Sequence, residues 1–254
     1  MTAAPDSPLA TLWCPSPNHE PRRNGFQPDM LILHYTGMDS AEAALDWLTR
    51  PESGVSCHYL VDEEGRIAQL VSESERAWHA GQSRWAGEID INSCSIGIEI
   101  HNPGHEFDYP DYPDAAMLSV EALCRDILSR HAIRPDRVLA HSDVAPGRKR
   151  DPGEKFDWRR LARAGIGLWV PPAPIEDDQG LGPGDEGETV AALQRDLLAY
   201  GYGVEVTSTY GTGLEKVVEA FQRHFRPARI DGRADQSTRE TLARLLAARR
   251  GRVV

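Results

Sequence analysis

The sequence predicts an α/β fold, a mixed central β-sheet flanked by helices, followed by a small all-α domain of three helices. Short apolar runs typical of strands alternate with helical patterns through the first two thirds of the chain, and after a proline-rich stretch only helical patterns remain. A length of 254 residues with 40% apolar content allows one large and one small domain, each with a core. We therefore expect a domain at 1–169, a linker at 170–180 and a second domain at 181–254.

The first half of the large domain reads as an arm, a strand, a helix and a hairpin. Residues 1–28 are rich in proline and polar side chains, which favours an irregular arm. Residues 29–35 are apolar, as in a strand buried on both faces. Ser40 is a suitable N-cap for a helix over 41–49, since its hydroxyl can accept from a free backbone N–H. Two strand-like runs around Glu63-Glu-Gly65 predict a β-hairpin.

The second half of this domain adds two strands and two helices. Residues 95–100 alternate like a strand that ends near Glu99, and 137–140 form a strand that delivers His141. A helix over 114–131, capped by Asp114, is indicated by apolar residues spaced by three and four. Residues 157–164 predict a last short helix.

Three apolar stripes at helical spacing follow the linker and predict the three-helix domain. Prolines stiffen the linker, and each stripe marks one helix face. The stripes are Val190, Leu193, Leu197 and Tyr200; Leu214, Val217, Phe221 and Phe225; and Thr238, Leu242 and Leu245. Such a bundle is small, and feasible but marginal on its own.

Charge and composition exclude several classes of partner. The net charge is −11 and no basic stripe could follow a phosphate backbone, so nucleic acid is not an expected partner. No apolar run approaches the roughly 18 residues of a membrane span, and no signal peptide is visible. The four cysteines lack C-x-x-C spacing and read as free thiols, with one disulfide as the alternative. We expect a cytoplasmic protein, or a periplasmic or extracellular one if a leader has been removed.

Two histidines and one aspartate predict a zinc site. His34 ends the apolar run before it, His141 ends the strand over 137–140, and Asp151 follows in a loop shaped by prolines and glycines. Zinc binds imidazole nitrogen and carboxylate oxygen, and a catalytic zinc site keeps its fourth position open. The alternative is that each residue is an ordinary polar group at a strand end.

Glu99 and Lys149 are the candidates for proton transfer and charge stabilisation. A partly buried carboxylate at a strand end holds protons more tightly, which suits a general base in amide hydrolysis. Lys149 stands two residues before Asp151 and could stabilise an oxyanion. We expect His58 and His79 to serve hydrogen bonds, not the metal. The loops 82–92 and 101–113 are expected to rim the cleft.

Five blocks of sequence resemble one enzyme family. They are Leu31-Ile-Leu-His-Tyr-Thr-Gly37, Ser56-Cys-His-Tyr-Leu-Val-Asp62, Arg76-Ala-Trp-His-Ala-Gly81, Ser95-Ile-Gly-Ile-Glu99 and His141-Ser-Asp-Val-Ala-Pro-Gly-Arg-Lys-Arg-Asp-Pro-Gly153. In this order they resemble the zinc-dependent N-acetylmuramoyl-L-alanine amidases of the AmpD type, relatives of peptidoglycan recognition proteins. The resemblance implies cleavage of the amide between the lactyl group of N-acetylmuramic acid and L-alanine.

The same resemblance assigns roles to the five candidate residues. It implies one Zn²⁺ per chain held by His34, His141 and Asp151, with Glu99 as general base and Lys149 as oxyanion stabiliser. Residues 181–238 resemble the peptidoglycan-binding domain often fused to wall hydrolases, except that Thr209-Tyr-Gly-Thr-Gly-Leu-Glu215 replaces the usual start of its second helix. The expected partners are soluble anhydro-muropeptides or polymeric peptidoglycan. The alternatives are a non-catalytic recognition module and a phage-type lysin.

Overall fold

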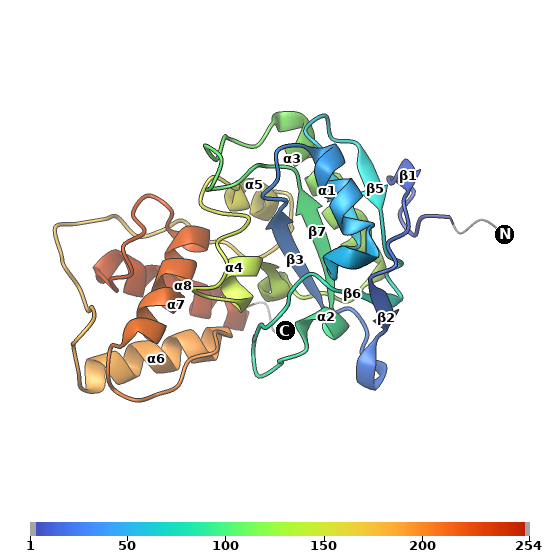
Figure 1. The fold of residues 1–254 in the computed structure, drawn as a ribbon. Coiled ribbons are helices and arrows are strands. Elements are labelled where there is room, and N and C mark those ends of the chain that lie inside the picture. Colours follow the sequence, from blue (N-terminus) through green and yellow to red (C-terminus); the bar gives the residue numbers. More distant parts are fainter. Residues whose placement is uncertain (1–3, 252–254) are drawn as a thin grey trace.

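The structure is a computed structural model that describes residues 4–251, and it shows a sheet domain beside a helical one (Figure 1). Six strands form the main sheet in the order β1-β5-β4-β7-β3-β8, and β2 and β6 form a separate antiparallel pair. The strands are β1 Leu12–Trp13, β2 His19–Pro21, β3 Met30–Tyr35, β4 Tyr59–Val61, β5 Ile67–Gln69, β6 Glu75–Ala77, β7 Ser95–Ile100 and β8 Val138–Ala140. The predicted α/β class is confirmed.

Six of the eight α-helices in residues 4–251 correspond to expected elements, whereas the one-turn helices α2 and α4 were not predicted. They are α1 Ala41–Leu48, α2 Ile91–Cys94, α3 Asp114–Arg130, α4 His141–Val144, α5 Trp158–Arg163, α6 Glu188–Tyr200, α7 Thr212–Phe225 and α8 Gln236–Gly251. Ser40 caps α1 as predicted, since its side chain accepts from the backbone N–H of Ala43. Asp114 does not cap α3: Pro113 occupies the cap position and Asp114 is the first helical residue.

The mixed sheet has one reversed pair. Strands β4, β7, β3 and β8 are parallel neighbours, β5 runs antiparallel to β4, and β1 runs parallel to β5. Alternation along β3 divides the core between the two faces, as the period of a strand requires. Leu31 and Leu33 pack with α3 on one face, while Met30 and Ile32 belong to the cluster on the other. His34 therefore points to the same face as Met30 and Ile32.

The N-terminal arm is irregular as predicted, except for two short strands that were not foreseen. Leu12 and Trp13 pair with Ala68 and Gln69 at the edge of the main sheet, and His19–Pro21 pair with β6. The two strands are only two and three residues long, so their sequences are too short for an alternating pattern to show.

The three helices of the C-terminal domain share their core with the sheet domain. One continuous cluster joins Met30, Ile32 and Leu139 of the sheet domain to Phe221 and Leu245 of the helices. The linker is also attached, because the backbone N–H of Ala173 donates to Thr241 Oγ1 (3.0 Å) and its carbonyl accepts from Ser237 Oγ (2.7 Å). The helical domain is thus packed against the sheet over a buried apolar surface.

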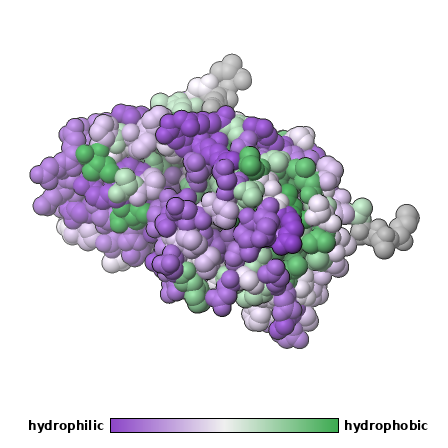
Figure 2. Space-filling model, turned by 90° about the horizontal axis from the view of Figure 1, so that it is seen from above, coloured by the Kyte–Doolittle hydropathy of each residue, from purple (hydrophilic) through white to green (hydrophobic). Residues whose placement is uncertain are grey.

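The face of the molecule drawn in Figure 2 is mainly hydrophilic. Figure 2 shows hydrophobic residues only in small patches between hydrophilic ones, as suits a chain of net charge −11. Across residues 4–251, we find no helix with the length and apolar character needed to cross a membrane. All four cysteines carry free thiols.

Candidate metal centre and active site

Strand pairing brings the candidate residues to one edge of the sheet. His34 lies opposite Glu99 in the parallel pair β3–β7, so the two side chains leave the same face of neighbouring strands. Leu33 lies opposite Ala140 in the pair β3–β8, which sets His141 beside His34. The carboxyl ends of parallel strands commonly form binding sites, because side chains from separate strands meet there.

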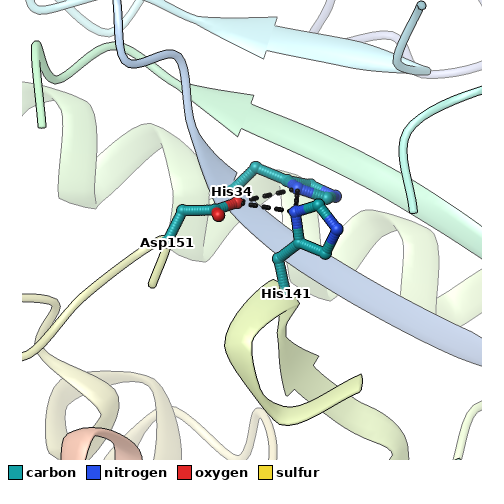
Figure 3. A group of neighbouring side chains, drawn as sticks. All are labelled: His34, His141 and Asp151. Atoms are coloured by element: carbon teal, nitrogen blue, oxygen red, sulfur yellow. Dashed lines mark hydrogen bonds and ion pairs between the residues drawn. The ribbon is translucent and has the colours of Figure 1, made fainter. Parts of the chain in front are cut away.

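The two histidines and Asp151 converge on one point (Figure 3). The two Nδ1 atoms of His34 and His141 are 2.9 Å apart, and Asp151 Oδ2 lies 3.0 Å from the first and 2.9 Å from the second. All three side chains are buried. No other group of three such residues with converging ligand atoms occurs in the described part of the chain.

The chemistry of these three groups fits a metal ion. His141 Nε2 lies 3.0 Å from the backbone carbonyl oxygen of Ala80. A carbonyl only accepts, so the His141 proton is on Nε2 and its Nδ1 is a bare lone pair. Burial lowers the pKa of His34 to about 4. Burial opposes ionisation of Asp151, but the adjacent imidazoles of His141 and His34 hold the pKa of its carboxyl below the usual range. Two imidazoles and a carboxylate are a donor set that suits zinc.

The segment that carries Asp151 is tied down on both sides. Its backbone carbonyl accepts from Ser142 N–H at 3.0 Å. The next carbonyl, of Pro152, accepts from the hydroxyls of Tyr109 (2.8 Å) and Tyr112 (2.7 Å). His141 begins the one-turn helix α4, which precedes the predicted loop that carries Asp151.

Asp143 links the His141 segment to the C-terminal domain. This fully buried carboxylate accepts from the hydroxyl of Tyr202 at 2.6 Å and from His224 Nδ1 at 2.7 Å. The same side chain accepts from the backbone N–H of Ala140, one residue before the candidate ligand His141. The contact was not foreseen, since the two partners are 59 and 81 residues away in sequence.

Glu99 and Lys149 line the same cavity as His141 and Asp151. The cavity has a volume of about 460 Å³. Burial and the charge of Asp151 raise the pKa of Glu99 well above its usual range, and the opposing effect of Lys149 is smaller. The Glu99 Oε2 atom is buried and has no hydrogen-bond partner among the described residues. A carboxylate held in this way is suited to taking up a proton beside the metal centre.

The outer walls of the cavity differ from the prediction. Met38 and Trp47 from the α1 region and Val55 and Trp78 from the segments around β4 and β6 form them. The loops 82–92 and 101–113 supply none of its described lining residues, so the expectation that they rim the cleft is wrong. The first contacts the C-terminal domain through Trp85, and the second holds Pro152 through Tyr109.

Three other histidines of the sheet domain, His58, His79 and His105, take part in hydrogen bonds. His58 Nδ1 accepts from Gly97 N–H at 3.0 Å, and His79 Nδ1 lies 3.0 Å from His34 Nε2. His105 lies between Tyr35 and Glu154. The prediction that His58 and His79 serve hydrogen bonds is confirmed.

Comparison with known families agrees with this geometry. Residues 24–154 match the family described as "N-acetylmuramoyl-L-alanine amidase", and residues 186–242 match the family described as "Putative peptidoglycan binding domain". The chain belongs to the N-acetylmuramoyl-L-alanine amidase family. It is therefore an enzyme, and the resemblance drawn from the five sequence blocks is confirmed, while the non-catalytic alternative is set aside.

The relatives of this amidase match most of its length. It is 38% identical to N-acetylmuramoyl-L-alanine amidase AmiD of Escherichia coli K12 over 230 residues, which are 85% of this chain and 82% of that protein. The structure of the E. coli protein in complex with anhydro-N-acetylmuramic acid-L-Ala-D-gamma-Glu-L-Lys is 36% identical, with a TM-score of 0.74 over 89% of this chain and 91% of that one. AmpDh3 of Pseudomonas aeruginosa with anhydromuramic pentapeptide is 30% identical, with a TM-score of 0.73 over 98% and 99%.

Proposed function

We propose that this amidase is zinc-dependent and that His34, His141 and Asp151 hold the zinc ion. The observation that carries the proposal is the convergence of three ligand atoms, all within 4.8 Å of one another, at a cavity that His141 and Asp151 line together with Glu99 and Lys149. Three protein ligands leave the fourth position of a tetrahedral zinc site open for chemistry.

Glu99 and Lys149 would handle the proton and the developing charge. Zinc, when bound, supplies Lewis-acid chemistry that makes water more acidic and polarises a carbonyl. Glu99 would take a proton from the attacking water and give it to the nitrogen of the leaving L-alanine, since its raised pKa lets it do both. Lys149 would place its ammonium beside the oxygen of the scissile carbonyl and stabilise the negative charge there.

The substrate we propose is an anhydro-muropeptide, cut between the lactyl group and L-alanine in peptidoglycan recycling. Both relatives described above are seen with an anhydromuramic peptide. The cavity supports this, because Trp47 and Met38 offer an apolar wall to a sugar or peptide while polar groups converge on the metal centre.

We also propose a division of the chain into a catalytic domain at 1–169, a linker at 170–180 and a peptidoglycan-binding-like domain at 181–254. It is supported by the two family matches, which leave residues 155–185 between them, and by the lack of any helix or strand from 170 to 180. The buried contacts between the two domains indicate a fixed arrangement.

Metal content and turnover of the wild type and of two variants test the site. We expect the wild type to hold one zinc ion per chain and to release L-alanine peptides from anhydro-muropeptide. His34→Ala should lose both zinc and turnover, whereas Glu99→Ala should keep the zinc and lose turnover. Full turnover by both variants would remove the proposal.

A comparison of two substrates tests the substrate class. Rates on soluble anhydro-muropeptide and on intact sacculi should be measured at matched amounts of the amide bond. We expect the soluble substrate to be cleaved faster. Strong preference for sacculi would overturn the recycling assignment and favour a lytic role on the polymer.

A further inference from the structure

A chain of hydrogen bonds runs from His34 into the core on the side away from the metal centre. His34 Nε2 lies 3.0 Å from His79 Nδ1, and His79 Nε2 lies 3.1 Å from the hydroxyl of Ser95. That hydroxyl is 2.6 Å from the backbone carbonyl oxygen of Ile91. His34, His79 and Ser95 are all buried, and His79 also lines the cavity.

The direction of every bond in this chain follows from its last acceptor. The Ile91 carbonyl can only accept, so the single Ser95 proton points to it, and the Ser95 oxygen must accept from His79 Nε2–H. A neutral imidazole has one N–H, and the bond to Ser95 places that of His79 on Nε2. His79 Nδ1 is then a lone pair that accepts from His34 Nε2–H.

The consequence reaches the metal centre. With its proton on Nε2, His34 presents a bare Nδ1 to His141 and Asp151 (Figure 3). His141 has the same tautomer because it donates to the Ala80 carbonyl. In these tautomers the three converging atoms offer lone pairs, which together suit a cation.

The fold keeps room for His79 at one specific place. Gly97 on β7 faces the imidazole, and a Cβ atom added there would come 2.5 Å from His79 Cγ. The backbone N–H of His79 also donates to Asn92 Oδ1 at 3.1 Å. The ring is thus fixed by its backbone, by the space at Gly97 and by Ser95.

We propose that His79, held by Ser95 and Gly97, is a positioning residue that sets the tautomer and orientation of His34 and thereby the affinity for the metal. The proposal rests on the metal site described under the proposed function. His79 is not itself a fourth ligand, since its Nδ1 faces His34 Nε2 and not the converging atoms. Partners of this kind around zinc ligands typically change metal affinity by about 10–100-fold when they are removed.

The matched pair His79→Leu and His79→Asn separates hydrogen bonding from packing. Leucine fills the space but accepts no hydrogen bond, whereas the asparagine amide oxygen can take the place of Nδ1 as acceptor. By chelator competition, we expect about 10–100-fold weaker zinc binding for His79→Leu, and near wild-type binding for His79→Asn. Gly97→Ala should weaken zinc binding because it displaces the ring. Equal binding by His79→Leu and wild type, or equal loss in both His79 variants, would overturn the proposal.

A spectroscopic readout tests the same proposal without the metal. Long-range ¹H–¹⁵N spectra of the metal-free protein should show His34 and His79 protonated on Nε2, and His79→Leu should lose the single His34 tautomer. A His34 proton on Nδ1 in the wild type would overturn the proposal. Failure of the wild type to bind zinc would instead remove the proposed metal site, so the two failures are distinguishable.

His58→Asn is the control for general damage to this part of the core. His58 is a fully buried histidine whose ring centroid is 5.7 Å from that of His79, but it contacts Gly97 N–H and not a candidate ligand. Asparagine can still accept from Gly97 N–H. We expect this variant to keep wild-type zinc affinity, and a loss equal to that of His79→Leu would show that the effect is not specific to His79.

Discussion

The two histidines of the proposed metal centre are supported by different parts of the molecule. His34 stands on β3, which has a paired strand on either side, and its side chain is backed by His79 from the same domain. His141 follows β8 at the edge of the sheet, and the nearby Asp143 is held by Tyr202 and His224 of the C-terminal domain. Strand pairing fixes His34 in the middle of the sheet, whereas at the edge of the sheet contacts from the C-terminal domain fix the segment of His141.

The largest expected effect comes from removing a ligand on either side. His34→Ala and His141→Ala should both lose zinc and turnover, because two protein ligands cannot keep the site. Glu99→Gln should keep zinc and reduce turnover by about 10²–10⁴-fold, the usual contribution of a positioned proton carrier. Metal analysis and steady-state kinetics check this. Zinc retained by only one histidine variant would show that the two sides are unequal.

Trp85→Ala should break the contact between the domains. Trp85 is 1% exposed and packs against Tyr200 and Tyr202 of the C-terminal domain. Truncation of a buried tryptophan costs about 3–5 kcal/mol of unfolding free energy. Denaturant unfolding of the wild type should show one transition, because the domains share a core, and the variant should unfold at lower denaturant. Two separate transitions in the wild type would contradict the shared core.

Tyr202→Phe should weaken the His141 side alone. It removes one donor from the buried Asp143, which costs about 1–3 kcal/mol, and it should also weaken zinc binding through the adjacent His141. Tyr210→Phe is the matched control, since its hydroxyl donates to the Gly232 carbonyl at 2.6 Å within the C-terminal domain. Unfolding and zinc titration check the pair. Equal zinc affinity in both variants would show that Asp143 does not support the site.

Acid should lower the free energy of unfolding over two different pH ranges, one set by His58 and one by Glu154. Burial, helped by Arg22, lowers the pKa of His58 in the sheet domain from 6.5 to about 3. The unfolded chain then binds more protons between these values, so unfolding free energy falls as pH falls from 6.5 to 3. At Glu154, which contacts Arg223 of α7, burial is outweighed by the hydrogen bond with His105, and the pKa falls from 4.5 to about 2.

The Glu154 contribution is therefore present above pH 4.5 and is lost as pH falls towards 2. Unfolding of the metal-free protein at successive pH values measures both effects. We expect His58→Asn to flatten the slope between pH 6.5 and 3, and Glu154→Gln to flatten it only below 4.5. An unchanged slope in His58→Asn would contradict the assignment to this histidine.

The sequence predicted features that neighbouring residues define, but not contacts between residues far apart in the chain. The strand before His34 and the helix over residues 114–131 could be predicted, because apolar patterns within a few residues define them. The support of each metal histidine could not. Ser95 and His79 are 16 residues apart and meet only in the folded chain, and Tyr202 of the C-terminal domain contacts Asp143 of the sheet domain.

The core that continues from Met30 and Leu139 into Phe221 and Leu245 bears on how this enzyme can be shortened or recombined. Removal of the C-terminal domain at the proline-rich stretch would expose an apolar face of the sheet to water. It would also leave Asp143 without two hydrogen-bond donors. A swap of residues 181–254 for a helical unit from another wall hydrolase would have to reproduce Tyr202, His224 and the seat for Trp85. In this protein, the domain matched to peptidoglycan binding is therefore not an interchangeable module.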